Sequence, residues 1–294
     1  MNKVGFIGVG IMGKSMVRNL MKAGFELHIY ARTKSKVEDV ISEEAQFHES
    51  IKDCVQDCDA VITIVGFPQD VEEVYFDEGN ILDSAKKGAY LIDMTTTSPQ
   101  IAEKIYEEGT KRGFHVMDAP VTGGDTGAKA GTLSILVGGE KEDYEACMPL
   151  FEAMGTNINY QGKAGCGQHC KLANQIMIAG TLSGVCEALT YAKEQGLDPE
   201  VFMKSVATGA AGSKQLDTFG PKILKDDYAP GFFMKHFIKD MKLALIEANR
   251  KGLSLDVLSM VLANYEELEQ EGYGDLGTQA LMKFYDEEHR NTEE

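Results

Sequence analysis

The sequence predicts an α/β fold with two domains: a doubly wound parallel sheet over residues 1–162 and an all-α domain over residues 163–294. Three observations lead to this fold class. The chain has 294 residues, more than a single hydrophobic core usually accommodates. In the first part, short β-rich runs alternate with helical stretches, as in parallel strands joined by crossover helices. After Gly162 the β-rich runs stop, and apolar residues recur at helical spacing.

Each expected element has a local signal. The expected strands are KVGFI (3–7), ELHIY (26–30), AVITIV (60–65), AYLID (89–93), FHVMD (114–118) and TLSILVGG (132–139). The longest expected helix runs from about Gln168 to Gln195, because Gly196 and Pro199 form a typical helix end. We expect the acidic last segment, DEEHRNTEE, to be a solvated terminus.

Composition and charge exclude several classes of protein. Hydrophobic residues make up 43% of the chain and charged residues 26%, as in globular rather than disordered proteins. The 29 Lys and Arg residues against 46 Asp and Glu residues give a net charge of -17, which disfavours nucleic acid and anionic membranes as partners. No uncharged apolar run approaches the ~20 residues that span a bilayer. The six cysteines fit reduced thiols, so we expect a cytoplasmic protein.

The first motif with chemical meaning is a GxGxxG turn between the first expected strand and a helical stretch. Its first glycine permits a tight turn, the second lets the backbone approach a pyrophosphate, and the third lets helix and strand pack closely. The start of the helix attracts the phosphates. The motif therefore predicts a Rossmann-type dinucleotide site, against the alternatives of a structural turn or another nucleotide. The expected cofactor-binding residues are Gly8, Gly10, Ile11, Met12 and Gly13.

The loop after the second expected strand indicates which dinucleotide binds. NAD sites usually place Asp or Glu there, on the ribose 2′-hydroxyl. This chain instead has Arg32, Thr33 and Lys36, which can together hold a 2′-phosphate. We therefore expect NADP(H) in preference to NAD(H), although such residues are also common on ordinary surface loops.

The second motif is a run of small residues over 118–139. Within it, Thr122 offers a hydroxyl, while Gly123 and Gly124 offer successive unhindered backbone amides. Such amides can form a nest that binds a carboxylate. The alternative is a flexible glycine-rich turn.

The third motif, GKAGCGQHCKLANQ, leads into the long helix. Lys171 and Asn174 are three residues apart and share a helix face, with Gln175 beside them. A lysine with a lowered pKa can pass a proton to a substrate oxygen as hydride arrives at the neighbouring carbon. The alternative is a lysine that faces solvent.

The start of the long expected helix contains a possible metal-binding pattern. Cys166, His169 and Cys170 have the spacing of metal ligands on one helical turn, but without a fourth ligand we expect no metal.

The fourth motif is an amphipathic helix within residues 231–248. Its expected apolar stripe consists of Phe237, Met241, Leu245 and Ala248. Lys239 and Asp240 lie off that stripe, either as an exposed charged edge or with the lysine at the cofactor and the aspartate behind it.

The four motifs in this order resemble the β-hydroxyacid dehydrogenase family, which includes 3-hydroxyisobutyrate dehydrogenase and tartronate semialdehyde reductase. The resemblance covers essentially the whole chain, through GFIGVGIMGKSM, DAPVTGGDTGAKAGTL, GCGQHCKLANQ and FIKDMKLA. It implies reversible hydride transfer between NADP(H) and a small 3-hydroxy acid or its semialdehyde, in a cleft between the two domains of a homodimer or homotetramer. The alternatives are a semialdehyde or glyoxylate reductase of the same family and a non-catalytic dinucleotide sensor.

The resemblance also implies a role for individual residues. Lys171 would be the catalytic acid and base. Further cofactor contacts would be Val65, Gly66, Thr96 and Lys239. The substrate-binding set would be Thr122, Gly123, Gly124, Asn174, Gln175, Phe232 and Asp240. The chain departs from the common family pattern at Thr122, where relatives often have Ser, at Gln175, where they often have Asn, and at Ala31, where NADP-dependent relatives often have Asn.

Overall fold

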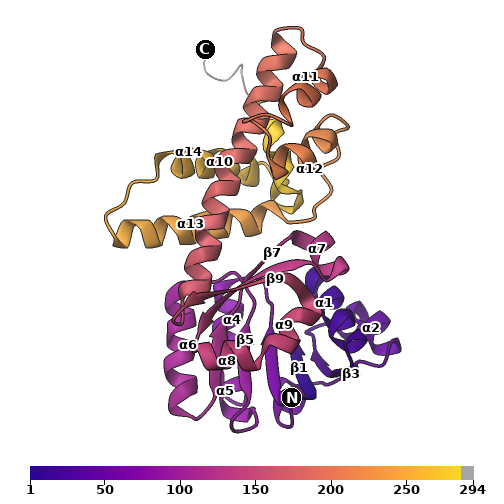
Figure 1. Ribbon diagram of the computed structural model, residues 1–294, viewed down its shortest axis with the longest axis vertical. Helices are drawn as coiled ribbons and strands as arrows, with labels where there is room; N and C mark the ends of the chain where they lie inside the picture. The colour runs from indigo at the N-terminus through magenta and orange to yellow at the C-terminus, as the bar shows by residue number, and fades with distance from the viewer. Residues whose placement is uncertain (286–294) are drawn as a thin grey trace. The chain divides into compact units, whose positions relative to one another are not determined.

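The computed structural model describes residues 1–285, so the acidic segment expected to be a solvated terminus lies outside the described residues. The chain divides into two compact units, unit 1 over Met1–Lys171 and unit 2 from Leu172 onward. Unit 1 is an α/β unit and unit 2 is helical (Figure 1). The predicted fold class is confirmed, and the division between the units falls inside one long helix.

Unit 1 is built on a nine-stranded sheet with the order β3-β2-β1-β4-β5-β6-β8-β7, and β9 pairs with β8. The strands are β1 Lys3–Ile7, β2 Glu26–Tyr30, β3 Gln46–Phe47, β4 Ala60–Thr63, β5 Tyr90–Asp93, β6 His115–Asp118, β7 Val121–Thr122, β8 Leu133–Gly139 and β9 Gly155–Gly162. The six expected strands are all present. The strands β3, β7 and β9 were not expected.

The sheet is not parallel throughout, which corrects the expectation. The strands β3, β2, β1, β4, β5 and β6, which are neighbours in the sheet in this order, are parallel to one another. Strand β8 runs antiparallel to β6 and to β7. A parallel connection needs a crossover of a dozen or more residues. Much of the chain between β6 and β8 is instead used by β7 and one short helix, so β8 returns in the opposite direction.

Helices cover both faces of the sheet in unit 1. They are α1 Ile11–Lys22, α2 Glu38–Ser42, α3 Ile51–Val55, α4 Pro68–Phe76, α5 Ile81–Ser84, α6 Pro99–Lys111, α7 Gly124–Ala130, α8 Lys141–Ala146 and α9 Met148–Met154, with a 3₁₀ turn η1 at Lys34–Lys36. Phe6 and Ile62 belong to one core cluster with α1, α7 and α9, whereas Ile7 and Val61 belong to another with α3 to α6. This alternation shows a sheet buried on both faces.

Unit 2 packs its helices around a single apolar core. Its elements are the greater part of α10 Cys166–Glu194, then α11 Pro199–Val206, α12 Lys214–Ile223, α13 Met234–Arg250, α14 Asp256–Gln270 and the 3₁₀ segments η2 Tyr273–Asp275 and η3 Thr278–Tyr285. The stripe expected on α13 is confirmed at Phe237, Met241 and Ala248, which are buried, while Leu245 is half-buried. The long helix ends within one residue of its predicted end.

Helix α10 has 29 residues and many apolar side chains. By length and composition alone it could cross a membrane, and no other helix within residues 1–285 could. Leu182, Cys186 and Leu189 of this helix are buried in the core of unit 2. Core packing therefore accounts for much of its apolar character.

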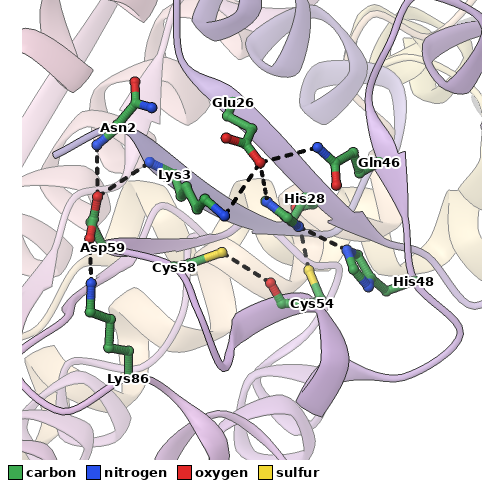
Figure 2. Close-up of polar contacts among 10 residues, drawn as sticks. All are labelled: Asn2, Lys3, Glu26, His28, Gln46, His48, Cys54, Cys58, Asp59 and Lys86. Atoms are coloured by element: carbon green, nitrogen blue, oxygen red, sulfur yellow. Dashed lines mark hydrogen bonds and ion pairs between the residues drawn. The ribbon is translucent and has the colours of Figure 1, made fainter.

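A polar cluster lies beside β2 in unit 1 (Figure 2). His28 is nearly buried, with its Nδ1 atom 2.9 Å from Nε2 of His48 and its Nε2 atom 3.1 Å from Oε1 of Glu26. Burial is the main cause of the lowered pKa of His48, and the neighbouring His28 adds to it. The Cys54 thiol donates to the His28 carbonyl oxygen at 3.3 Å, and burial raises the pKa of this thiol. These contacts join β2 to the segment after β3 and to α3.

Candidate active site

The ends of the parallel strands bring most of the predicted cofactor residues to one edge of the sheet. Ile7 lies opposite Thr63, and Thr63 lies opposite Asp93, so β1, β4 and β5 end at the same level. The GxGxxG turn, the segment 64–67 and the segment 94–97 directly follow these three ends. The strand order reverses direction between β1 and β4, and ligands of open α/β sheets bind at such a switch point.

The three glycines of the turn differ in what surrounds them. Gly8 has a φ of +98°, and a Cβ atom there would lie 2.1 Å from the Ile64 carbonyl oxygen. A Cβ at Gly13 would lie 2.1 Å from the Gly8 carbonyl oxygen. By contrast, a Cβ at Gly10, which precedes the first turn of α1, would meet nothing within 4 Å. Gly8 and Gly13 are thus required by the fold, whereas Gly10 leaves open space in front of a helix N-terminus, which fits a bound pyrophosphate.

The loop after β2 presents its cations to solvent. The Arg32 side chain is 71% exposed, and its Nη1 atom lies 3.2 Å from Oδ1 of Asp70, in the first turn of α4. Thr33 and Lys36 are also exposed. The loop is therefore accessible to a charged ligand, and Asp70 holds the guanidinium near the α4 side of the loop.

A buried hydrogen-bonded chain that the sequence analysis missed lies under the strand ends. The backbone N–H of Val65 donates to Oγ1 of Thr95 at 2.9 Å, and the N–H of Thr95 donates to Oδ1 of Asp93 at 3.1 Å. The same Oδ1 atom accepts from Oγ1 of Thr63 at 2.8 Å, and Thr63 in turn contacts the hydroxyl of Tyr75. This chain joins the two loops that hold Val65 and Thr96. The sequence signal that could have indicated this chain is Asp93, an aspartate at the end of the otherwise apolar strand β5.

Asp93 makes the stability of unit 1 depend on pH. Complete burial raises its pKa from 3.8 to about 6, against the opposing effect of its bonds to Thr95 and Thr63. Between these two pH values the folded state binds more protons than the unfolded state, so its stability falls as pH rises through the window. The penalty is complete above the folded pKa.

Replacing Asp93 with Asn removes this titration and keeps an oxygen acceptor for Thr63 and Thr95. From pH 4 to pH 7, we expect the free energy of unfolding of the wild type to fall relative to D93N by about 2 kcal/mol, which is most of the free energy that corresponds to the pKa shift. Urea unfolding at a series of pH values measures this difference. Parallel curves for the two proteins would show that Asp93 does not titrate in this window.

The first turn of α10 is held from the ends of β6 and β5. Asp118, the last residue of β6, accepts from the N–H of Gly165 at 2.7 Å and from the N–H of Gln168 at 2.8 Å. Burial raises the pKa of the Asp118 carboxyl group, and these two N–H donors oppose the increase. Lys171 lies on the next turn of this helix, and its side chain is buried.

The predicted carboxylate-binding segment sits between β7 and α7. Gly123 has a φ of +129° and Gly124 a φ of +64°, conformations that side chains rarely adopt. A Cβ at Gly124 would meet nothing within 4 Å, and Thr122 is half-buried. The segment is therefore a specific glycine-dependent conformation rather than a generic turn, with open space on one side. Its role in substrate binding stays a prediction.

Four other predicted residues form a continuous polar chain in unit 2. Nδ2 of Asn174 donates to Oε1 of Gln175 at 2.8 Å, and Nε2 of Gln175 donates to Oδ2 of Asp240 at 2.6 Å. The other oxygen of Asp240 lies 3.0 Å from Nζ of Lys239. Gln175 and Asp240 are buried, so the interpretation of Asp240 as an exposed charged edge is wrong. Gln175 uses both ends of its amide within the protein, which orients Asn174.

The remaining candidates are Phe232 and the possible metal ligands Cys166, His169 and Cys170. Phe232 is half-buried and precedes α13, with its ring centroid 6.1 Å from that of Phe237. Within residues 1–285, no group of three His, Cys, Asp or Glu side chains is arranged to hold a metal ion, and this applies also to Cys166, His169 and Cys170. The structure thus gathers the candidates into a set in unit 1 and a set in unit 2.

The fold and the carboxyl edge of its sheet define the class of protein: a Rossmann-type dinucleotide-binding enzyme with a helical second unit. The model for the NAD-binding domain of 6-phosphogluconate dehydrogenase matches residues 3–162, and that for NAD-binding of NADP-dependent 3-hydroxyisobutyrate dehydrogenase matches residues 165–285. The chain therefore belongs to the β-hydroxyacid dehydrogenase family, and it is an NAD(P)-dependent dehydrogenase or reductase of hydroxy acids. The resemblance carried by the four motifs is confirmed.

Individual relatives agree with this assignment. An uncharacterised oxidoreductase of Bacillus subtilis (strain 168) is 49% identical over 96% of this chain and 98% of its own. A probable mitochondrial 3-hydroxyisobutyrate dehydrogenase-like protein of Arabidopsis thaliana is 44% identical over 95% of this chain and 84% of its own. The structure of Mycobacterium tuberculosis 3-hydroxyisobutyrate dehydrogenase with L-serine is similar with a TM-score of 0.89 and 26% identity, over 97% of this chain and 99% of that one.

Proposed function

We propose that the protein transfers a hydride reversibly between NADP(H) and a small 3-hydroxy acid or its semialdehyde. The observation that carries this proposal is Lys171. It is a buried lysine one helical turn beyond Gln168, and Gln168 is bonded to the loop after β5 that holds the predicted cofactor residue Thr96. The L-serine of the similar mycobacterial structure is itself a 3-hydroxy acid, which supports this substrate class.

The residues of the chain divide the work of this reaction. The open space at Gly10 and the start of α1 would receive the pyrophosphate of the dinucleotide, whose nicotinamide supplies or accepts the hydride. Thr122 and the amides of Gly123 and Gly124 would hold the substrate carboxylate. Lys171 would give a proton to the carbonyl oxygen during reduction and take it back during oxidation. Holding the carboxylate and the amine in place supplies part of the rate enhancement, because the reacting groups need no further ordering.

A substrate panel tests this function directly. The loss of reduced-nicotinamide absorbance is followed with the semialdehydes of methylmalonate, tartronate and succinate and with glyoxylate, and kcat/KM is compared for NADPH and NADH. We expect turnover with at least one of the C3 or C4 semialdehydes. Cofactor binding without turnover across the whole panel would instead support a dinucleotide sensor.

The preference for NADP(H) has its own test at Arg32. The guanidinium is exposed on the loop after β2 and can bind a 2′-phosphate with two hydrogen bonds. We expect Arg32→Ala to lower kcat/KM for NADPH by about tenfold or more, the effect of losing 1.4 kcal/mol or more of phosphate binding, while kcat/KM for NADH changes little. Lys22→Ala, which removes a cation at the other end of α1, is the control. Equal losses with both cofactors would rule out 2′-phosphate recognition by Arg32.

We also propose that the protein is a cytoplasmic homodimer or homotetramer. Unit 2 exposes large apolar side chains on α10 and α14, including Met177, Val257 and Met260. Gly180 of α10 lies beside Val257, so the two helices present these side chains next to each other. Exposed apolar surface of this kind is typical of subunit interfaces. All six cysteines are free thiols, which fits a reducing compartment.

A further inference from the structure

Gln168 makes three hydrogen bonds to residues outside α10, one to the end of β6 and two to the loop after β5. Its side chain is fully buried. The backbone N–H donates to Oδ2 of Asp118 at 2.8 Å. In the side chain, Oε1 accepts from the N–H of Thr97 at 3.0 Å, and Nε2 donates to the carbonyl oxygen of Thr95 at 2.8 Å. The amide is therefore paired on both its donor and its acceptor side.

This pairing clamps a short stretch of backbone. A carboxamide that bonds an N–H and a C=O two residues apart in sequence resists both sliding and rotation of that segment. The residue between the two bonded ones is Thr96, the predicted cofactor contact. The other end of the clamp is the first turn of α10, which Asp118 also holds through the N–H of Gly165.

The start of α10 is also restrained by its packing against the sheet. A Cβ at Gly167 would lie 2.3 Å from the Leu136 carbonyl oxygen, so the helix backbone is packed directly against β8. Lys171 follows Gln168 by three residues, which is about 4.5 Å along a helix axis. A shift of the loop at residues 95–97 relative to the first turn of α10 would therefore change the distance between Lys171 and the cofactor loop.

We propose that Gln168 is a positioning residue, which sets the amine of Lys171 at a fixed distance from the cofactor loop at residues 95–97. This inference rests on the proposed function, because Lys171 is the proton donor under that proposal. Gln168 itself is assigned no contact with substrate or cofactor. The role requires a side chain that both donates and accepts. Glu at this position would keep only the acceptor, and it would add a negative charge close to the buried Asp118 carboxylate.

The test compares Gln168→Leu and Gln168→Glu with a matched control, Tyr265→Phe. Tyr265 also makes a fully buried bond to a backbone carbonyl, that of Thr278 in unit 2, so its loss measures the general cost of such a bond. We expect kcat to fall by about 10- to 100-fold in Q168L, because small displacements of catalytic groups have effects of this size. The effect on KM should be smaller, within about threefold, since Gln168 does not touch the substrate. Q168E keeps the acceptor for Thr97 but places a carboxylate oxygen against the Thr95 carbonyl oxygen and a charge near Asp118, so its kcat should fall at least as far as that of Q168L.

The double variant with Lys171 separates positioning from stability. If Gln168 acts through Lys171, Gln168→Leu should lower kcat by no more than about threefold in a Lys171→Met background, because the group that it positions is already absent. A full, additive loss in that background would overturn the proposal. So would a Q168L protein with a lower Tm and an unchanged kcat, as expected for the control.

Hydrogen exchange of the cofactor-free protein gives a readout that needs no activity. Peptides covering residues 93–98 and 163–171 should exchange faster in Q168L than in wild type, and should be unchanged in Y265F. Unchanged exchange in Q168L would overturn the clamp itself. If the wild type turns over no substrate of the panel, the proposed function is overturned. If only the clamp is wrong, the wild type is active and Q168L is as active as the wild type.

Discussion

Replacement of Lys171 with Met should lower kcat by about 10²- to 10⁴-fold, the usual contribution of a positioned acid or base. The substitution keeps most of the apolar stem of a buried side chain and removes only the amine, so the fold should be retained. The affinity for NADPH, measured by fluorescence titration, should change far less than kcat. This pattern marks an interaction used mainly in the transition state.

Lys163 provides the matched control for this experiment. It is an exposed lysine in the loop that leads into α10, and it has no assigned role in the site. Lys163→Met should leave kcat and KM at wild-type values. Turnover of the Lys171 variant within about threefold of wild type would show that another group transfers the proton.

The second large effect is expected at the glycine turn, where two similar substitutions should have different results. Gly10→Ala should leave Tm unchanged, because its φ of -86° suits alanine and the added methyl group meets no protein atom. The methyl group would, however, occupy the open space in front of α1. We therefore expect the Kd for NADPH to rise by about 10- to 100-fold, which corresponds to a loss of about 1.4 to 2.8 kcal/mol.

Gly13→Ala should act on the fold instead. Its methyl group would lie 2.1 Å from the Gly8 carbonyl oxygen, so α1 must move away from β1. Overpacking of this kind costs about 1–3 kcal/mol of stability, measured by urea unfolding. If Gly10→Ala destabilises the protein as much as Gly13→Ala does, the site in front of α1 is not open and the proposed pyrophosphate position is wrong.

Local patterns were sufficient where a property depends on neighbours in sequence. The six expected strands, the end of α10 and the stripe on α13 follow from period and from helix-ending residues, and all are present. The steric need for Gly8 and Gly13 also follows from the strand–turn–helix motif alone. The short strands β3, β7 and β9 were missed because pairing partners, more than composition, define them.

The supporting residues of the site could not be found in the same way. Asp118 and Gln168 are 50 residues apart, and Gln168 and Thr95 are 73 apart, yet they are bonded in the folded chain. No residue pattern specifies such distant partners, and each of these side chains alone is an ordinary polar residue. Gln175 shows the same limit, because the sequence suggested a substrate contact while the structure also pairs its amide with Asn174 and Asp240.

The sequence by itself thus determined the α/β class, the glycine turn and the family to which the chain belongs, because these depend on residue type and spacing along the backbone. Only the tertiary structure decided the direction of β8, the burial of Asp93 and Asp240, and the attachment of α10 to the loop after β5. These features depend on which distant groups meet in a water-excluded interior. There, a buried polar atom is stable when the folded chain brings it a partner, and that choice is made by the packing of the whole unit.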